Sequence, residues 1–222
     1  MGDLGPFWLS LKVASVATLL DVALGGPLAL VLARGRFPGK SLMAGVLMLP
    51  LVLPPTVLGY LLLVLLGRRS PVGGWIEHAL GGSLVFHWTG GAVAAAVAAF
   101  PLFLIPARSA FETVDPLLED AARLLGRHEF SVLWSVTLPL AWRGLVAGVV
   151  LAFARALGDF GATLMVAGDI PGRTQTAALA IYDAVQAGDN ARAGGLAVLI
   201  SIVSIAALMV AQFRGRPRGA GA

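Results

Sequence analysis

The sequence contains no cysteine, few charged residues and only three histidines. Without cysteine, the chain can form no disulfide, no thiolate nucleophile and no cysteine-ligated metal site. The histidines at positions 78, 87 and 128 are scattered, so we expect this chain to bind no metal and no cofactor. Charged residues make up 13% of the 222 residues, whereas hydrophobic residues make up 58%. This balance excludes an ordinary soluble domain and predicts an integral membrane protein.

Five hydrophobic stretches approach the ~20 residues that a membrane-spanning helix needs. Four of them run from Leu42 to Leu66, Leu84 to Ile105, Val136 to Leu157 and Leu196 to Phe213. The fifth runs from about Leu9 to Leu32 and contains Lys12 and Asp21. It is too long for the core of a signal peptide, so we interpret it as a retained span. The sequence predicts an all-α membrane protein with about five spans, in a single domain over residues 1–222.

Basic residues are unevenly divided between the two sides of this predicted membrane domain, and they favour cytoplasmic loops. Nine fall on one side: Arg34, Arg36, Lys40, Arg108, Arg123, Arg127, Arg214, Arg216 and Arg218. The other side receives Arg68, Arg69, Arg173 and Arg192, with Lys12 near the start of the first span. We therefore predict an N-terminus outside and a C-terminus in the cytoplasm. Since these charges are dispersed, they form no patch for nucleic acid.

Proline and small residues mark two of the spans. The second span contains Pro50, Pro54 and Pro55, which remove backbone donors and bend or break a helix. Such a break can be merely structural, or it can shape a transport pathway. The fourth span has small residues at four-residue spacing, which favours close helix packing. These residues are Gly144, Gly148, Ala152 and Ala156.

Ionisable side chains at membrane depth are costly unless they face protein or water. Asp21 lies in the first span, and Arg155 and Asp159 lie at the outer end of the fourth. The last two are four residues apart and can pair along one helix. Alternatively, Arg155 lines a path for an anion. We take Pro54, Pro55, Arg155 and Asp159 as candidate pathway residues.

A polar segment from Asp115 to Pro139 separates the third and fourth spans. Asp115 suits a helix N-cap, Pro116 the first helical position and Gly126 the left-handed residue that ends a helix. Between them, one side carries Leu117, Leu118, Ala121, Leu124 and Leu125, and the other carries Glu119, Asp120 and Arg123. Periodicity alone leaves two interpretations open. The helix lies on lipid headgroups, or it docks a soluble partner.

Two segments resemble catalytic or nucleotide-binding motifs only superficially. Residues 34–41, RGRFPGKS, end like a phosphate-binding loop, but Arg34 occupies the position of the first required glycine and no strand precedes it. Gly81, Gly82 and Ser83, followed by His87, are a weak signal for an intramembrane hydrolase. We therefore expect a chain that is not an enzyme and binds no ATP itself.

The polar segment resembles the EAA signature of ABC importer permeases. Asp120, Ala121 and Ala122 are followed after three residues by Gly126 and after nine more by residues 136–139, VTLP. Asp120 stands for the family's glutamate, and Val136 for its isoleucine. The resemblance implies that residues 106–139 form a cytoplasmic coupling loop whose helix docks an ATPase subunit. The implied coupling residues are Glu119, Asp120, Ala121, Ala122, Arg123, Gly126, Leu138 and Pro139.

Further segments resemble molybdate permease subunits, over about residues 8–213. They are FPGK (37–40), LPLVLPP (49–55), GY (59–60), GRR (67–69) and LAFARALGDFGAT (151–163). Sulfate and tungstate permeases are similar in the same regions and remain alternatives for the substrate. The resemblance implies the type I ABC importer permease (MetI-like) fold and ATP-driven molybdate import across the cytoplasmic membrane of a prokaryote.

The implied partners complete this transporter. They are a second copy of the chain, two cytoplasmic ATPase subunits that bind ATP and Mg, an external oxyanion-binding protein and the surrounding membrane lipid. A secondary transporter driven by an ion gradient is the alternative from another class. It would need no docking helix and no ATP.

Overall fold

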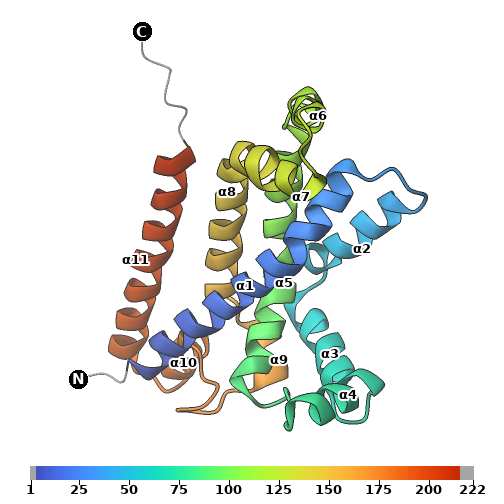
Figure 1. Cartoon of the computed structure of the whole chain (residues 1–222). Helices are drawn as coiled ribbons and strands as arrows, with labels where there is room; N and C mark the ends of the chain where they lie inside the picture. The colour runs from blue at the N-terminus through green and yellow to red at the C-terminus, as the bar shows by residue number, and fades with distance from the viewer. Residues whose placement is uncertain (1–3, 216–222) are drawn as a thin grey trace.

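The computed structural model describes residues 4–215, which form helices and connecting turns without a β-strand (Figure 1). The helices are α1 (Gly5–Arg34), α2 (Lys40–Val52), α3 (Pro55–Leu66), α4 (Pro71–Leu80), α5 (Trp88–Glu112), α6 (Pro116–Leu124), α7 (Glu129–Val132), the π turn η1 (Leu133–Thr137), α8 (Leu138–Leu157), α9 (Gly161–Ala167), α10 (Ala177–Gln186) and α11 (Asn190–Gly215). Arg216 and Arg218, which contributed to the predicted orientation, lie outside the described residues.

Within the described range, four continuous segments are long and apolar enough to cross a membrane. They are Gly5–Arg34, Trp88–Glu112, Glu129–Leu157 and Asn190–Met209. Helices α2 and α3 pass the same test only together, as a pair bent by 115°. If the bent pair is one span, the total is five. The sequence prediction of about five spans in an all-α chain is confirmed.

The break between α2 and α3 lies at the predicted prolines. Leu53 and Pro54 have extended backbones, with ψ of 138° at both, and Pro55 begins α3. A residue before proline disfavours the helical region, and proline at the first helical position loses no hydrogen bond. Pro50 lies inside α2 without ending it. The second span is therefore two half-helices, as expected from Pro54 and Pro55.

The core is built from small side chains on three long helices. Buried alanines of α5 pack with Ala14 and Ala17 of α1 and with Ala152 and Ala156 of α8. A Cβ atom added to Gly144 would lie 2.5 Å from the Cβ of Ala110. Small residues let helix backbones approach closely, which strengthens packing where lipid supplies no hydrophobic driving force. The predicted close packing of the fourth span is confirmed.

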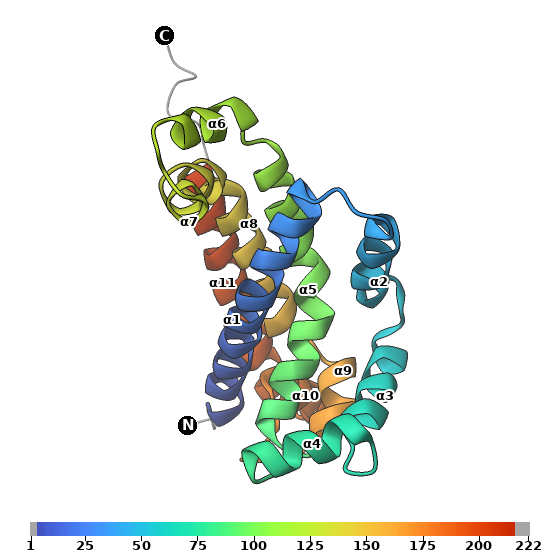
Figure 2. The ribbon, with the colours of Figure 1, turned by 45° about the vertical axis from the view of Figure 1, so that its right-hand side comes forward.

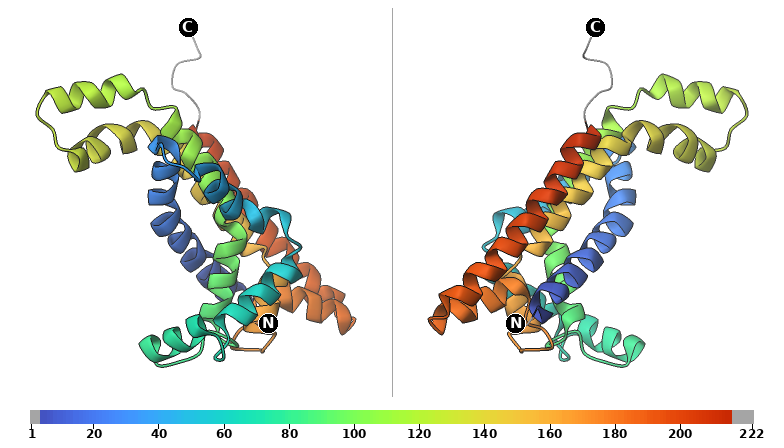
Figure 3. Two further views of the ribbon diagram at one scale, coloured as in Figure 1. Left: turned by 90° about the vertical axis from the view of Figure 1, so that its right-hand side faces the viewer. Right: turned by 90° about the vertical axis from the view of Figure 1, so that its left-hand side faces the viewer.

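Helix α11 and the bent pair of α2 and α3 run beside this three-helix core, and the shorter helices lie at its two ends. Helices α6 and α7 lie at one end, beside the connection from α1 to α2 (Figure 2). Helices α4, α9 and α10 lie at the other end, with the beginning of α1 (Figure 1). Seen from the side, α6 and α7 form a hairpin that projects away from the long helices (Figure 3). In all these views α6 is the outer member, and α7 lies between it and the spans.

Adjacent glycines of α1 provide a test of the packing. A Cβ on Gly25 would lie 2.6 Å from Cδ1 of the buried Phe103 ring, whereas nothing lies within 4 Å of one on Gly26. We expect Gly25→Val to lower the free energy of unfolding by about 1–3 kcal/mol, because overpacking forces the core apart. Gly26→Val, with the same change in helix propensity, is the control. Equal unfolding midpoints of the two variants in detergent would show that Gly25 is not packed against Phe103 in the protein.

Candidate functional site

Helix α6 begins and ends at the residues that the sequence indicated. Oδ1 of Asp115 accepts a hydrogen bond from the backbone N–H of Leu117 at 2.9 Å, and Pro116 is the first helical residue. Gly126 has a φ of +82°, and the N–H of Arg127 bonds the carbonyl of Ala122 at 3.2 Å. This is the 6→1 bond of a Schellman motif, which requires a left-handed residue before its donor. The predicted cap and terminating glycine are therefore confirmed.

The apolar side of α6 is uncovered in this chain. Leu117, Leu118, Leu124 and Leu125 are 72%, 50%, 90% and 84% exposed. Ala121 is also exposed, whereas Ala122 is buried toward the rest of the molecule. We call the surface formed by Leu117, Leu118, Ala121, Leu124 and Leu125 the leucine face. Clustered leucines on a projecting helix are typical of a surface that another molecule covers.

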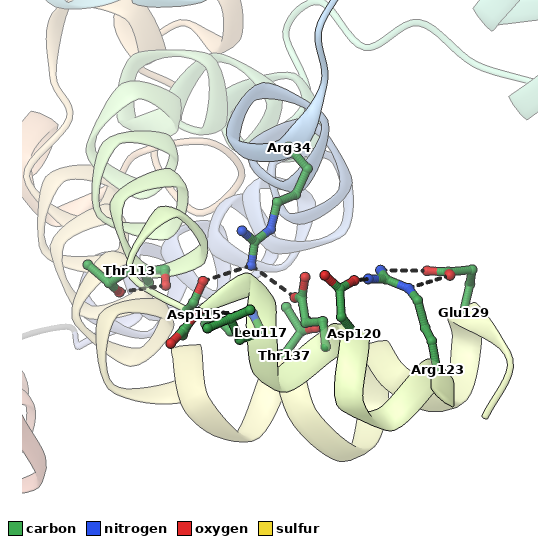
Figure 4. Close-up of polar contacts among 11 residues, drawn as sticks. Arg34, Thr113, Asp115, Leu117, Asp120, Arg123, Glu129 and Thr137 are labelled. Atoms are coloured by element: carbon green, nitrogen blue, oxygen red, sulfur yellow. Dashed lines mark hydrogen bonds and ion pairs between the residues drawn. The ribbon is translucent and has the colours of Figure 1, made fainter. Parts of the chain in front are cut away.

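Glu119 faces the body of the protein, unlike its charged neighbours. It is 7% exposed, and its Oε1 accepts hydrogen bonds from Nη2 of Arg34 at 2.9 Å and from Oγ1 of Thr137 at 2.7 Å. The same Nη2 donates to the carbonyl of Val114 at 3.1 Å. Figure 4 shows Arg34 reaching from the end of α1 into this cluster. Periodicity placed Glu119 with Asp120 and Arg123, but it did not reveal these inward partners.

Arg123 ties α6 to α7 at the tip of the hairpin. Its Nη1 donates to Oδ1 of Asp120 at 2.7 Å, and its Nε and Nη2 donate to the two carboxylate oxygens of Glu129 at 2.7 and 3.1 Å (Figure 4). The hydrogen bonds to Glu129 and then to Asp120 raise the pKa of Arg123 above its ordinary value. The pair with Glu129 is bidentate, which fixes the relative orientation of the two side chains.

The other two residues of the predicted coupling set lie at the beginning of α8. Leu138 is partly buried and packs against the core, and Pro139 is exposed. Both follow the π turn η1, whose last residue is Thr137. They are therefore part of the junction between the hairpin and the fourth span and not of the leucine face.

Three of the four candidate pathway residues meet at one cavity of about 320 Å³. Pro55 at the start of α3 lines it together with Arg155 in the last turn of α8 and Asp159 in the turn that follows. Pro54 is exposed at the helix break and does not line the cavity. The remaining lining residues are Thr56, Gly158, Phe160, Gly161, Leu164 and Met165. The break in the second span thus lies beside the only ionisable pair of this cavity.

Asp159 is buried and fully hydrogen-bonded. Its Oδ1 accepts from Nη1 of Arg155 at 3.1 Å, and its Oδ2 accepts from the N–H and Oγ1 of Thr163 at 2.9 and 2.8 Å. The predicted pairing along the helix is therefore confirmed. The side chain of Arg155 is 31% exposed, against 1% for Asp159. The arginine can present positive charge to the cavity, while the aspartate partly neutralises it.

Sequence reasoning assigned no role to Thr163 or Thr137, although both bond buried carboxylates. Asp159 lies one residue before the N-cap of α9, Phe160, and accepts the otherwise unpaired N–H of Thr163 in the first helical turn. Thr137 lies 18 residues from Glu119, so its contact depends on the folding of the hairpin. Asp21 is 1% exposed in α1, with Oδ2 unbonded among the described residues, and does not line this cavity.

These features are those of a membrane transport component, and comparison with known proteins defines the family. Residues 25–215 match the family described as "Binding-protein-dependent transport system inner membrane component". The chain belongs to this family. It is accordingly a multi-pass permease subunit of the inner membrane and not an enzyme.

Individual relatives are similar over nearly the whole chain. The molybdenum transport system permease protein ModB of Escherichia coli (strain K12) is 44% identical over 94% of this chain and 91% of its own length. The putative molybdenum transport system permease protein YvgM of Bacillus subtilis (strain 168) is 41% identical over 93% and 91%. Among solved structures, an inward-facing MetNI methionine ABC transporter chain has a TM-score of 0.69 at 18% identity, covering 97% of this chain and 100% of that chain. The last likeness confirms the MetI-like fold.

Asp159 and Asp189 both accept a backbone N–H at the start of a helix, and we expect the loss of the buried Asp159 to destabilise the protein more. Asp159→Ala removes the bonds to Thr163 and leaves Arg155 unpaired, so we expect a loss of about 2 kcal/mol or more in unfolding free energy. Asp189→Ala removes an exposed cap, where Oδ1 accepts from the N–H of Arg192 at 3.0 Å, and should cost about 1 kcal/mol. Thermal unfolding in detergent measures both. Asp159→Asn keeps a hydrogen-bond acceptor, so its loss of unfolding free energy should lie between those of the two alanine variants. A smaller loss for Asp159→Ala than for Asp189→Ala would refute the role of Asp159 as a buried, hydrogen-bonded carboxylate.

Proposed function

We propose that this chain is the permease subunit of an ATP-driven ABC importer that carries molybdate across the cytoplasmic membrane. The observation that carries the proposal is the leucine face. It is an uncovered apolar surface on α6, and the hydrogen bonds of Glu119 hold this helix against the membrane-spanning helices. The assignment of molybdate is supported by identities of 44% and 41% to molybdenum transport permeases over more than nine-tenths of the chain. No ATP site is expected in this chain, so hydrolysis and Mg binding belong to a partner.

The leucine face favours a protein partner over lipid. The side of α6 that carries Glu119 and Ala122 is buried against the body, and α7 lies between α6 and the spans (Figure 3). The leucines are therefore on the side of α6 that is turned away from the membrane-spanning helices. A helix lying on lipid would turn its apolar side the other way. An apolar groove of a cytoplasmic ATPase subunit is the proposed occupant.

This docking determines the proposed orientation. The α6 end of the molecule is cytoplasmic, and the beginning of α1 lies outside. The cavity at Arg155 is at the opposite end from α6 and receives the ion from an external oxyanion-binding protein. An importer of this kind takes its substrate from outside and its driving force from inside.

The cavity chemistry suits passage of a dianion. Arg155 offers positive charge, and Asp159 partly offsets it at 3.1 Å. A fully unpaired arginine would hold a dianion tightly in a low-dielectric environment, whereas a partly neutralised one holds it weakly. We infer weak, transient contact with the ion.

A second copy of the chain completes the pathway. Pro55 and Arg155 line a cavity that this chain only partly encloses, and α2 has no fully buried residue. Two-fold pairing would place the two cavities around one axis and cover exposed apolar side chains such as Val52 and Tyr60. Lipid surrounds the rest of the spans.

Sulfate and tungstate remain the alternative substrates within the same class. A chloroplastic sulfate permease 2 of Chlamydomonas reinhardtii is 36% identical over 91% of this chain and 54% of its own length. A secondary transporter is the alternative mechanism, and the leucine face argues against it because no docking helix would be needed.

Reconstituted transport tests the function. Liposomes with the permease, its ATPase and its binding protein should accumulate radiolabelled molybdate only with ATP, and more of it than of sulfate. Arg155→Ala should lower uptake about tenfold or more, because Asp159 then presents unbalanced negative charge to the anion. Uptake without ATP would refute the importer mechanism. Full uptake by Arg155→Ala would remove this residue from the pathway.

Co-purification tests the docking surface separately. Leu124→Asp places a charge on the leucine face, at its most exposed residue, and should weaken binding of the ATPase about 30- to 150-fold, equivalent to about 2–3 kcal/mol. Val72→Asp makes a similar change on exposed α4, at the opposite end of the molecule, and should leave ATPase binding intact. Equal recovery of the ATPase with both variants would show that the leucine face is not the docking surface.

A further inference from the structure

We propose that Arg34 is a positioning residue that joins the first span to the docking helix, so that displacement of α6 carries the end of α1 with it. The proposal rests on the proposed function, because it assumes that an ATPase moves α6. It adds a residue outside the polar segment 115–139 to the coupling machinery. It also gives the first span a part in coupling.

The geometry of the junction links three elements through one carboxylate. Arg34 is the last residue of α1, Glu119 is in the middle of α6, and Thr137 ends the π turn before α8. Both hydrogen bonds to Glu119 end on the same oxygen, Oε1. Because Nη2 of Arg34 also bonds the Val114 carbonyl, the arginine holds the chain immediately before α6 as well as α6 itself. Figure 4 shows dashed bonds leaving the tip of the Arg34 side chain where it meets the segment around α6.

Burial makes this junction stronger than the exposed ion pairs of the same hairpin. Side-chain exposure is 28% for Arg34 and 9% for Glu119, compared with 39% for Arg123 and 61% for Asp120. Exposed pairs contribute little because water screens them, whereas breaking a buried pair leaves a charge without a partner. Arg123 ties α6 to α7, which moves with it. Arg34 ties α6 to a span that is 85 residues away in the sequence.

The hairpin of α6 and α7 joins the fourth span through the π turn η1. A π turn inside a helix closes its hydrogen bonds over five residues instead of the four of an α-helix, and such turns are frequent at functional sites. Here η1 separates α7 from α8 and supplies Thr137 to the junction. If the hairpin pivots at η1 relative to α8, the Arg34–Glu119 bond passes the displacement to α1.

Only one nitrogen of the Arg34 guanidinium makes the hydrogen bonds that join α1 to α6. Nη2 makes both bonds, and Nε is buried without a hydrogen-bond partner among the described residues. The planar fork of the guanidinium is therefore not used in full, and a lysine ammonium could replace part of its function. The nearby Arg36 is exposed and serves as a matched control on the same connection.

The first experiment measures coupling in the reconstituted complex. Arg34→Ala and Glu119→Gln should still bind and activate the ATPase, but the ATP hydrolysed per molybdate imported should rise about fivefold or more, at the lower end of typical coupling energies. Arg34→Lys should restore part of the loss, and Arg36→Ala should behave as wild type. A normal ratio for Arg34→Ala, or loss of ATPase binding by it, would overturn the proposal.

The second experiment does not depend on the substrate. Because the chain has no native cysteine, spin labels attach to it only at Val31→Cys and Arg127→Cys, and the distance to follow is the one between α1 and the hairpin within one copy. Adding ATP to the assembled complex should leave this distance unchanged with Arg34 present and alter or broaden it in Arg34→Ala. The same change in distance with Arg34 present and in Arg34→Ala would show that Arg34 does not link α1 to the hairpin. Absence of ATP-driven molybdate uptake by the wild type would instead count against the proposed function.

Discussion

Close approach of α1, α5 and α8 is the constraint on which the other features of the structure depend. In a membrane the spans gain little from burying apolar surface, so their association depends on contact between backbones and small side chains. The alanines of α5 and the glycines of α8 supply that contact, and Phe103 fills the space beside Gly25 and Gly148. This rigid three-helix core holds the two functional regions at opposite ends, one at the cavity of Arg155 and the other at α6.

The cavity exists because the second span is not a continuous helix. Pro54 and Pro55 end α2 and start α3 at a new angle, and α3 then packs against α9. Gly161 lies so close to Pro55 that a Cβ there would be 2.8 Å from the Cβ of the proline. Irregular backbone at membrane depth must be covered by protein or line a water-filled cavity, and here Pro55 lines the cavity while Pro54 is exposed in the single chain. The buried Asp159 then makes two kinds of contact, since it accepts hydrogen bonds from Thr163 in the first turn of α9 and from Arg155.

At the other end of the molecule, α6 buries a charged side chain and exposes its leucines, which is the reverse of an amphipathic helix in a soluble protein. The charged Glu119 is inside and the leucines are outside. Arg34 and Thr137 satisfy Glu119, so the helix is held against the rest of the chain without covering its apolar side. The hairpin can therefore remain ordered while it offers the leucine face to a partner. The same bonds that orient the helix are suited to transmit its displacement.

The sequence by itself determined the membrane class, the five apolar segments, the proline break and both ends of α6, because each depends on residues that are near one another in the chain. Hydropathy, proline geometry, an N-cap aspartate and a left-handed glycine act locally. The pairing of Arg155 with Asp159 is also local, at four residues. Only the tertiary structure decided that Glu119 turns inward to Arg34 and that Pro55 meets Arg155 across a cavity. Those contacts join segments that are 85 and 100 residues apart, and no helical period can specify them.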